Sequence, residues 1–238
     1  MAEDPIKLFS SRADRLPQPD DRDRMTEMAE KVIGTVPGAN LVAAVLSPHF
    51  LVPAINRRRD EWLKELADDF DRLSEECNVE NVVRNEAFIS ASIQATRIAL
   101  ATHQEEKRQY LRNALLNIAL GKGPDELRQQ IFLNAIEAFA PAHVKALDAI
   151  RLGRVPWDEH KIPLGQRNYG SAIEIFTPEL KGEPSLMKAV LADLRNRGFS
   201  NLDRADYPFP EGGLVTNLGV EFLRFVRTPA QTLAKGLT

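Results

Sequence analysis

The chain has 238 residues, of which 43% are hydrophobic and 27% charged, as expected for a globular protein. Its formal net charge of -3 excludes a general attraction to nucleic acid or to an anionic membrane, so such contacts would require a local patch. The one cysteine, Cys77, excludes an internal disulfide framework and a zinc site built from several cysteines, which favours a reducing cytoplasm.

Residues 1–31 are predicted to form a polar N-terminal arm. They mix acidic, basic and proline residues and lack the apolar core of a secretion signal. The run from Pro17 to Arg24 is too polar to pack against a core. An open alternative is that Ile6, Leu8 and Phe9 anchor a short helix on the body of the protein.

The segment from Val32 to Asn56 carries no formal charge and is followed directly by three arginines. Its length would cross a bilayer, and cationic clusters of this kind lie at lipid headgroups. Three prolines interrupt it, however, and leave no continuous apolar stretch of the roughly 20 residues that a spanning helix needs. We therefore expect a broken apolar element that packs on the bundle or on a partner chain, with conditional membrane association as the alternative.

This segment supplies the candidate contact surface for a protein partner, for self-association or for a membrane. We expect the contacts to be made by its larger apolar side chains and by the arginines that follow them, which are Leu41, Val45, Leu46, Phe50, Leu51, Arg57, Arg58 and Arg59. The arginines are also expected to mark the start of the next helix.

Helical periodicity continues beyond the arginines. Large apolar residues recur at three- and four-residue spacing on one face, at Trp62, Leu66, Phe70 and Leu73. Further helices are expected over 86–102, 104–120, 125–139 and 141–152. Gly121 stands where a helix ends in the left-handed conformation. Residues 32–152 are therefore predicted to form an all-helical bundle.

Residues 153–182 are predicted to be an irregular connecting segment. Prolines and glycines are dense there and break regular elements. Within this segment, Ala172 to Phe176 is compatible with a short strand or with the start of a helix, and periodicity does not decide between them.

The final part, residues 183–238, is predicted to form a small winged-helix-like α/β unit. Pro184 suits the first turn of a helix that stops at Gly198. A polar excursion, a strand-like stretch at 214–216 and an apolar helix at 218–226 follow. Many winged-helix modules finish in this order. The predicted fold class is thus mainly α, a helical bundle followed by a small α/β unit.

Four short motifs are similar to those of a known family. They are NALLNIA at 113–119, FLNAI at 132–136, FAPAHVKAL at 139–147 and GLVTNLGVEF at 213–222. Through them, roughly residues 62–226 resemble the Abi-alpha, or abortive-infection-alpha, family of bacterial proteins. The resemblance implies a bacterial protein connected with phage defence. It carries over no catalytic residue.

Few residues point to chemistry. The chain lacks the sequence motifs of common catalytic and nucleotide-binding sites. His103 and Glu106 are spaced like two metal ligands, but no second such pair completes a site, so a solvated helix start is expected. His143 and His160 are expected to have structural or surface roles, and acidic neighbours disfavour a thiolate at Cys77. We therefore predict no catalytic residue, cofactor or metal, while an enzyme assembled from distant residues stays open.

Two functions follow from these patterns. The first is a non-enzymatic phage-defence or stress-associated factor that acts through protein or membrane contacts, in the cytoplasm or peripheral to the inner membrane. The alternative is a winged-helix-type DNA-binding transcriptional regulator. Residues 181–238 contain eight basic and six acidic side chains, a net charge of only +2, which disfavours DNA binding. The candidate phosphate contacts of the alternative are Lys188, Arg195, Arg197 and Arg204.

Overall fold

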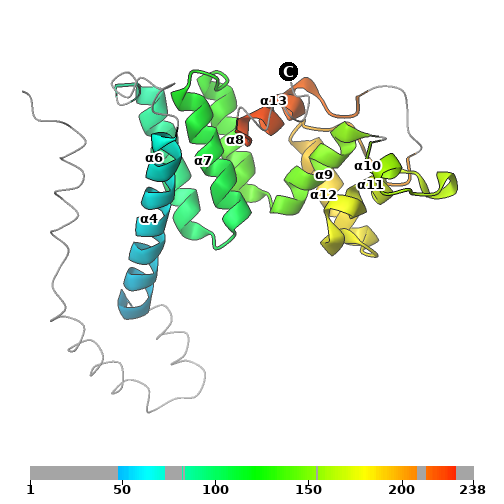
Figure 1. The fold of residues 1–238 in the computed structure, drawn as a ribbon, viewed down its shortest axis with the longest axis horizontal. Coiled ribbons are helices and arrows are strands. Elements are labelled where there is room, and N and C mark those ends of the chain that lie inside the picture. The colour runs from blue at the N-terminus through cyan, green and yellow to red at the C-terminus, as the bar shows by residue number, and fades with distance from the viewer. Residues whose placement is uncertain (1–47, 73–81, 83, 154, 208–212, 229–238) are drawn as a thin grey trace, which may run out of the picture. The chain divides into compact units, whose positions relative to one another are not determined.

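The computed structural model describes residues 48–72, 82, 84–153, 155–207 and 213–228. Over these residues the chain is mainly helical, as predicted (Figure 1). The chain divides into two compact units, Met1–Arg58 and Arg59–Thr238. Residues 48–58 are the described part of the first unit, and the remaining described residues belong to the second.

The first described helix, α4, runs from Pro48 to Asp71. The prediction that the arginines at 57–59 begin this helix is wrong, because the helix starts at Pro48 and includes Pro53. A proline in the first turn costs no intrahelical hydrogen bond, since the amide at that position has no partner in the helix. Pro53 lies farther in and removes one backbone donor.

Four predicted helices of the bundle are confirmed. They are α6 (Glu86–Ala101), α7 (Glu105–Ala119), α8 (Glu126–Ala138) and α9 (Pro141–Leu152). The Asn85 side chain accepts hydrogen bonds from the first amides of α6, and Asp125 does the same for α8, which satisfies donors that the helix leaves open. Gly121, after α7, has the left-handed φ of 66° that its position predicted.

Helix α6 packs against both α7 and α8 (Figure 1). Trp62 of α4 is fully buried, and its indole Nε1 donates to Thr96 Oγ1 of α6 at 3.1 Å. Phe70 of α4 meets Phe88 edge to face, with 6.0 Å between the ring centroids. The described part of the predicted apolar face, from Trp62 to Phe70, therefore packs on the bundle, and Leu73 lies outside the described residues.

Residues 153–182 contain four short helices among the described residues. They are α10 (Val155–Glu159), the 3-10 helix η1 (Leu164–Gln166), α11 (Tyr169–Phe176) and the 3-10 helix η2 (Pro178–Leu180). The ambiguous stretch at 172–176 is helical. Asn168 and Ser171 form a reciprocal capping box that starts α11, and its Ile173 is fully buried where α11 packs on α9.

The C-terminal part supplies α12 (Pro184–Asn196) and α13 (Asn217–Phe225). The predicted glycine stop is confirmed, because Gly198 has φ 75°. Between these helices, Ser200 and Val215 form one isolated antiparallel bridge. No strand occurs among the described residues, so the α/β character expected of this part is not shown.

Aromatic packing joins α13 to the bundle helices of the second unit. Phe222 of α13 stacks on Phe199 with 4.7 Å between centroids, and Phe132 of α8 lies 5.5 Å from Phe222. Gly219 makes this approach feasible, since a Cβ there would overlap the Phe199 carbonyl group. The C-terminal helices thus share one hydrophobic core with α6 to α9.

Candidate functional site

The predicted contact segment is described only in its last part. Leu41, Val45 and Leu46 lie outside the described residues, whereas Phe50 and Leu51 lie in the first turn of α4. The arginines follow in the middle of the same helix. Two apolar side chains outside the predicted contact set, Val52 and Ile55, are 49% and 43% exposed. Their spacing of three places them on one helix face.

Arg57, Arg58 and Arg59 differ in exposure. Arg57 is exposed, while Arg58 and Arg59 are half-buried. Arg59 pairs with the neighbouring Asp60 at 3.1 Å. A pair between adjacent, partly exposed side chains contributes little to stability, so it does not prevent Arg59 from contacting another charge.

The four predicted phosphate contacts do not share one environment. Lys188 and Arg195 are exposed on α12. Arg197 lies over the ring of Phe139, with its Cζ 5.2 Å from the centroid. Arg204 pairs with a neighbouring aspartate, Asp206, at 3.0 Å. Two of the four cations therefore have partners within the chain.

The three histidines whose side chains the structure describes lie in different environments. His143 stacks on Phe139 with 4.7 Å between centroids, and its Nε2 lies 3.3 Å from Asp193 Oδ2. His103 and His160 are exposed. Glu106, which is spaced from His103 like a second metal ligand, pairs with Lys145 at 2.9 Å. Within the described ranges, no group of three or more potential ligands is placed to hold a metal ion.

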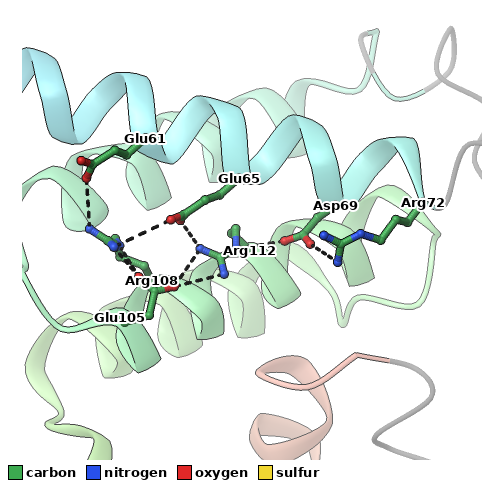
Figure 2. A network of polar contacts seen from close by, with 7 residues as sticks. All are labelled: Glu61, Glu65, Asp69, Arg72, Glu105, Arg108 and Arg112. Atoms are coloured by element: carbon green, nitrogen blue, oxygen red, sulfur yellow. Dashed lines mark hydrogen bonds and ion pairs between the residues drawn. The ribbon is translucent and has the colours of Figure 1, made fainter.

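The sequence did not suggest an ion-pair network that joins α4 to α7 (Figure 2). Arg112 of α7 is its centre, with a side chain only 10% exposed. Its Nε donates to Asp69 Oδ2 at 2.9 Å, and its Nη1 donates to Glu65. Arg108, one turn earlier, pairs with Glu105 and lies 3.8 Å from Glu65. Two cations of α7 thus hold acidic side chains of α4 against the bundle.

The network perturbs the titration of Glu105. Burial raises the pKa of this carboxyl, but hydrogen bonds and positive charge from Arg108 and Arg112 outweigh burial, so the pKa falls below its ordinary value of 4.5. The folded state therefore favours the ionised carboxylate. Stability from this preference is complete above the ordinary pKa and is lost as the pH falls through the lowered one.

A second polar feature lies at the C-terminal end of α13. Asn117 of α7 is buried, and its Nδ2 approaches the carbonyl oxygens of Arg227 at 2.7 Å and Phe225 at 3.1 Å. The amide of Asn113 donates to the Val226 carbonyl at 2.9 Å. These side chains satisfy carbonyl groups that the end of a helix leaves open. Two asparagines at four-residue spacing in an apolar helix were the sequence signal for this feature.

Beside this helix end, Asp148 of α9 pairs with two arginines. Arg227 Nη2 lies 2.5 Å from Asp148 Oδ2, and Arg151 Nε donates to Oδ1 at 3.1 Å. A cavity of about 380 Å³ adjoins the cluster and is lined by Tyr110 and Lys145, among others. Most of its lining side chains are polar or charged, and Val144, Phe176 and Val226 supply the apolar part.

Comparison with known proteins does not assign this chain to a family. A scan against models of protein families finds no match, and searches of curated proteins and of solved structures find none. Through the described ranges, no helix is both long and apolar enough to cross a membrane.

Proposed function

We propose that the protein is a non-enzymatic factor of bacterial phage defence or stress response that acts through contacts of residues 32–59 with a membrane surface or a protein partner. The resemblance of residues 62–226 to the Abi-alpha family supports the cellular role. The exposed apolar face at the start of α4 supports the mode of action, and Val52 and Ile55 are the observation that carries it.

Physical chemistry favours a contact role for this face. Val52 and Ile55 lie on an uncharged stretch of helix, and three arginines follow directly. Helices that lie on anionic membranes combine an apolar face with cationic residues, because lipid burial and charge attraction then act together. A protein surface with an apolar groove and an acidic rim offers the same complementarity. Either contact is compatible with a cytoplasmic protein that is peripheral to the inner membrane.

Vesicle flotation and sedimentation test these contacts. The wild type is compared with a Val52→Asp and Ile55→Asp double variant and with Leu127→Asp, which alters a side chain that is 67% exposed on α8. We expect the wild type to float with anionic vesicles or to self-associate, and the double variant to lose either property by at least about tenfold. Leu127→Asp should behave as the wild type. A wild type that neither floats nor self-associates would exclude a lipid surface and a second copy of the chain as the partner of this face.

DNA binding by a winged-helix-like C-terminal unit is a second candidate. Two exposed cations, Lys188 and Arg195, support it because they lie seven residues apart on α12 and therefore on one face. Affinity for duplex DNA should then fall steeply with salt concentration and should weaken in Lys188→Glu and Arg195→Glu. Binding that is absent, or independent of salt and of both substitutions, would remove this candidate.

A further inference from the structure

The cluster of Asp148, Arg151 and Arg227 holds more positive than negative charge. One carboxylate lies between two guanidinium groups, and the side chains are 9%, 15% and 10% exposed, respectively. Lys145 and Glu106, which line the adjoining cavity, form a neutral pair of their own. These five described side chains therefore carry a net charge of +1. Burial of an uncompensated charge is energetically unfavourable, so this cluster favours the binding of an additional negatively charged group.

Hydrogen-bonding capacity points in the same direction. Among the residues that the structure describes, the buried Arg227 Nη1 has no hydrogen-bond partner, although Nη2 of the same guanidinium pairs with Asp148. Buried polar atoms of native proteins almost always have a partner. Asp148 accepts from Arg151 through Oδ1 and pairs with Arg227 through Oδ2, so both of its oxygens are engaged. The spare capacity at this cluster thus belongs to a donor, which a further acceptor would satisfy.

The adjoining cavity provides space and additional donors. Its volume is about 380 Å³, within the range of small-molecule sites. Burial and the negative charge of Glu106 raise the pKa of Tyr110, while Arg227 opposes the shift and Asp148 adds to it, so the hydroxyl remains a donor at neutral pH. Apolar walls complete the cavity, and they are formed by Val144, Phe176 and Val226.

We infer that this cavity binds a small organic monocarboxylate. The carboxylate oxygens accept hydrogen bonds from Arg227, Lys145 and Tyr110, and the apolar body of the ligand lies against the three apolar side chains. A single negative charge neutralises the excess of the cluster, whereas a phosphate dianion would overcompensate it. The inference is independent of the contacts proposed for α4, because the cavity is lined by α7, α9, α11 and the end of α13.

The test uses benzoate, phenylacetate and butanoate as probes, with benzamide as a neutral control of the same shape as benzoate. Titration calorimetry of the full chain should show binding of at least one carboxylate, at least about tenfold tighter than benzamide or inorganic phosphate. Lys145→Gln and Tyr110→Phe should each weaken that binding several-fold, while Lys188→Gln, on the exposed face of α12, should leave it unchanged.

Three results would overturn the inference. They are no binding of any of the three carboxylates, equal affinity for benzoate and benzamide, and binding that Lys145→Gln and Tyr110→Phe leave intact. Arg227→Gln is a harsher variant, because it also breaks the pair with Asp148. Its thermal unfolding is therefore recorded first, and Lys145→Gln, whose side chain is 35% exposed, keeps the test decisive if Arg227→Gln does not fold.

Discussion

Replacing Asn117 by alanine tests whether the buried amides of α7 hold the end of α13. The two protons on Nδ2 are shared among four carbonyl oxygens, of Arg227 at 2.7 Å, Asn113 at 2.9 Å, Phe225 at 3.1 Å and Arg224 at 3.4 Å. The substitution removes about two hydrogen bonds worth about 1 kcal/mol each and leaves buried carbonyl groups without a donor. The free energy of unfolding should fall by about 2–4 kcal/mol.

Urea denaturation followed by circular dichroism measures this loss, and hydrogen exchange of the α13 amides localises it. Asn134→Ala is the matched control, because Asn134 is exposed and accepts one hydrogen bond, from Gln94 at 2.7 Å. Asn134→Ala should lower the free energy of unfolding by less than about 1 kcal/mol. The reasoning is refuted if Asn117→Ala is no more destabilising than Asn134→Ala, or if exchange in α13 does not change.

Three further predictions concern packing and charge. Gly219→Ala should lower the free energy of unfolding by about 3 kcal/mol in denaturation experiments. Gly165→Ala should be nearly neutral, because a Cβ there meets no described atom within 4 Å. Equal effects of the two substitutions would refute the close approach of α13 to the Phe199 carbonyl group. In the same assay, Arg112→Met should lower the free energy of unfolding by about 2–3 kcal/mol. The control Arg72→Met, whose side chain is 74% exposed, should lower it by less than about 1 kcal/mol. A small loss in Arg112→Met would mean that the network does not hold α4 against α7. In unfolding experiments across pH, Glu105→Gln should lose less stability than the wild type as the pH falls below 4.5, and parallel pH profiles would contradict the lowered pKa.

The helices of the second unit were predictable from local signals. The spacing of Trp62, Leu66 and Phe70 identified the buried face of α4, and the glycines at 121 and 198 marked the ends of α7 and α12. Such signals act within a few turns of the chain and need no tertiary information. The start of α4 was missed because Pro48 and Pro53 were interpreted as breaks. Pro48 lies in the first turn, where a proline is compatible with a helix, whereas Pro53 lies inside the helix and removes one backbone donor.

The polar sites were not predictable because their partners are distant in sequence. Arg112 and Glu65 are separated by 47 positions, and Asn117 and Arg227 by 110. A charged residue on an amphipathic helix normally faces solvent, so the sequence gives no reason to pair Arg112 with α4. Spacing alone indicated only that Asn113 and Asn117 share one face of an apolar helix.

Protection of cells against phage measures the central claim most directly, because under the proposed function it would depend on the contact surface at the start of α4, whichever partner that surface meets. Bacteria that express the wild type, the Val52→Asp and Ile55→Asp double variant, or Leu127→Asp at equal levels are challenged with a panel of phages. We predict that the wild type and Leu127→Asp reduce the plating efficiency of at least one phage, and that the double variant does not. No reduction by the wild type, or equal protection by the double variant, would contradict the proposed function.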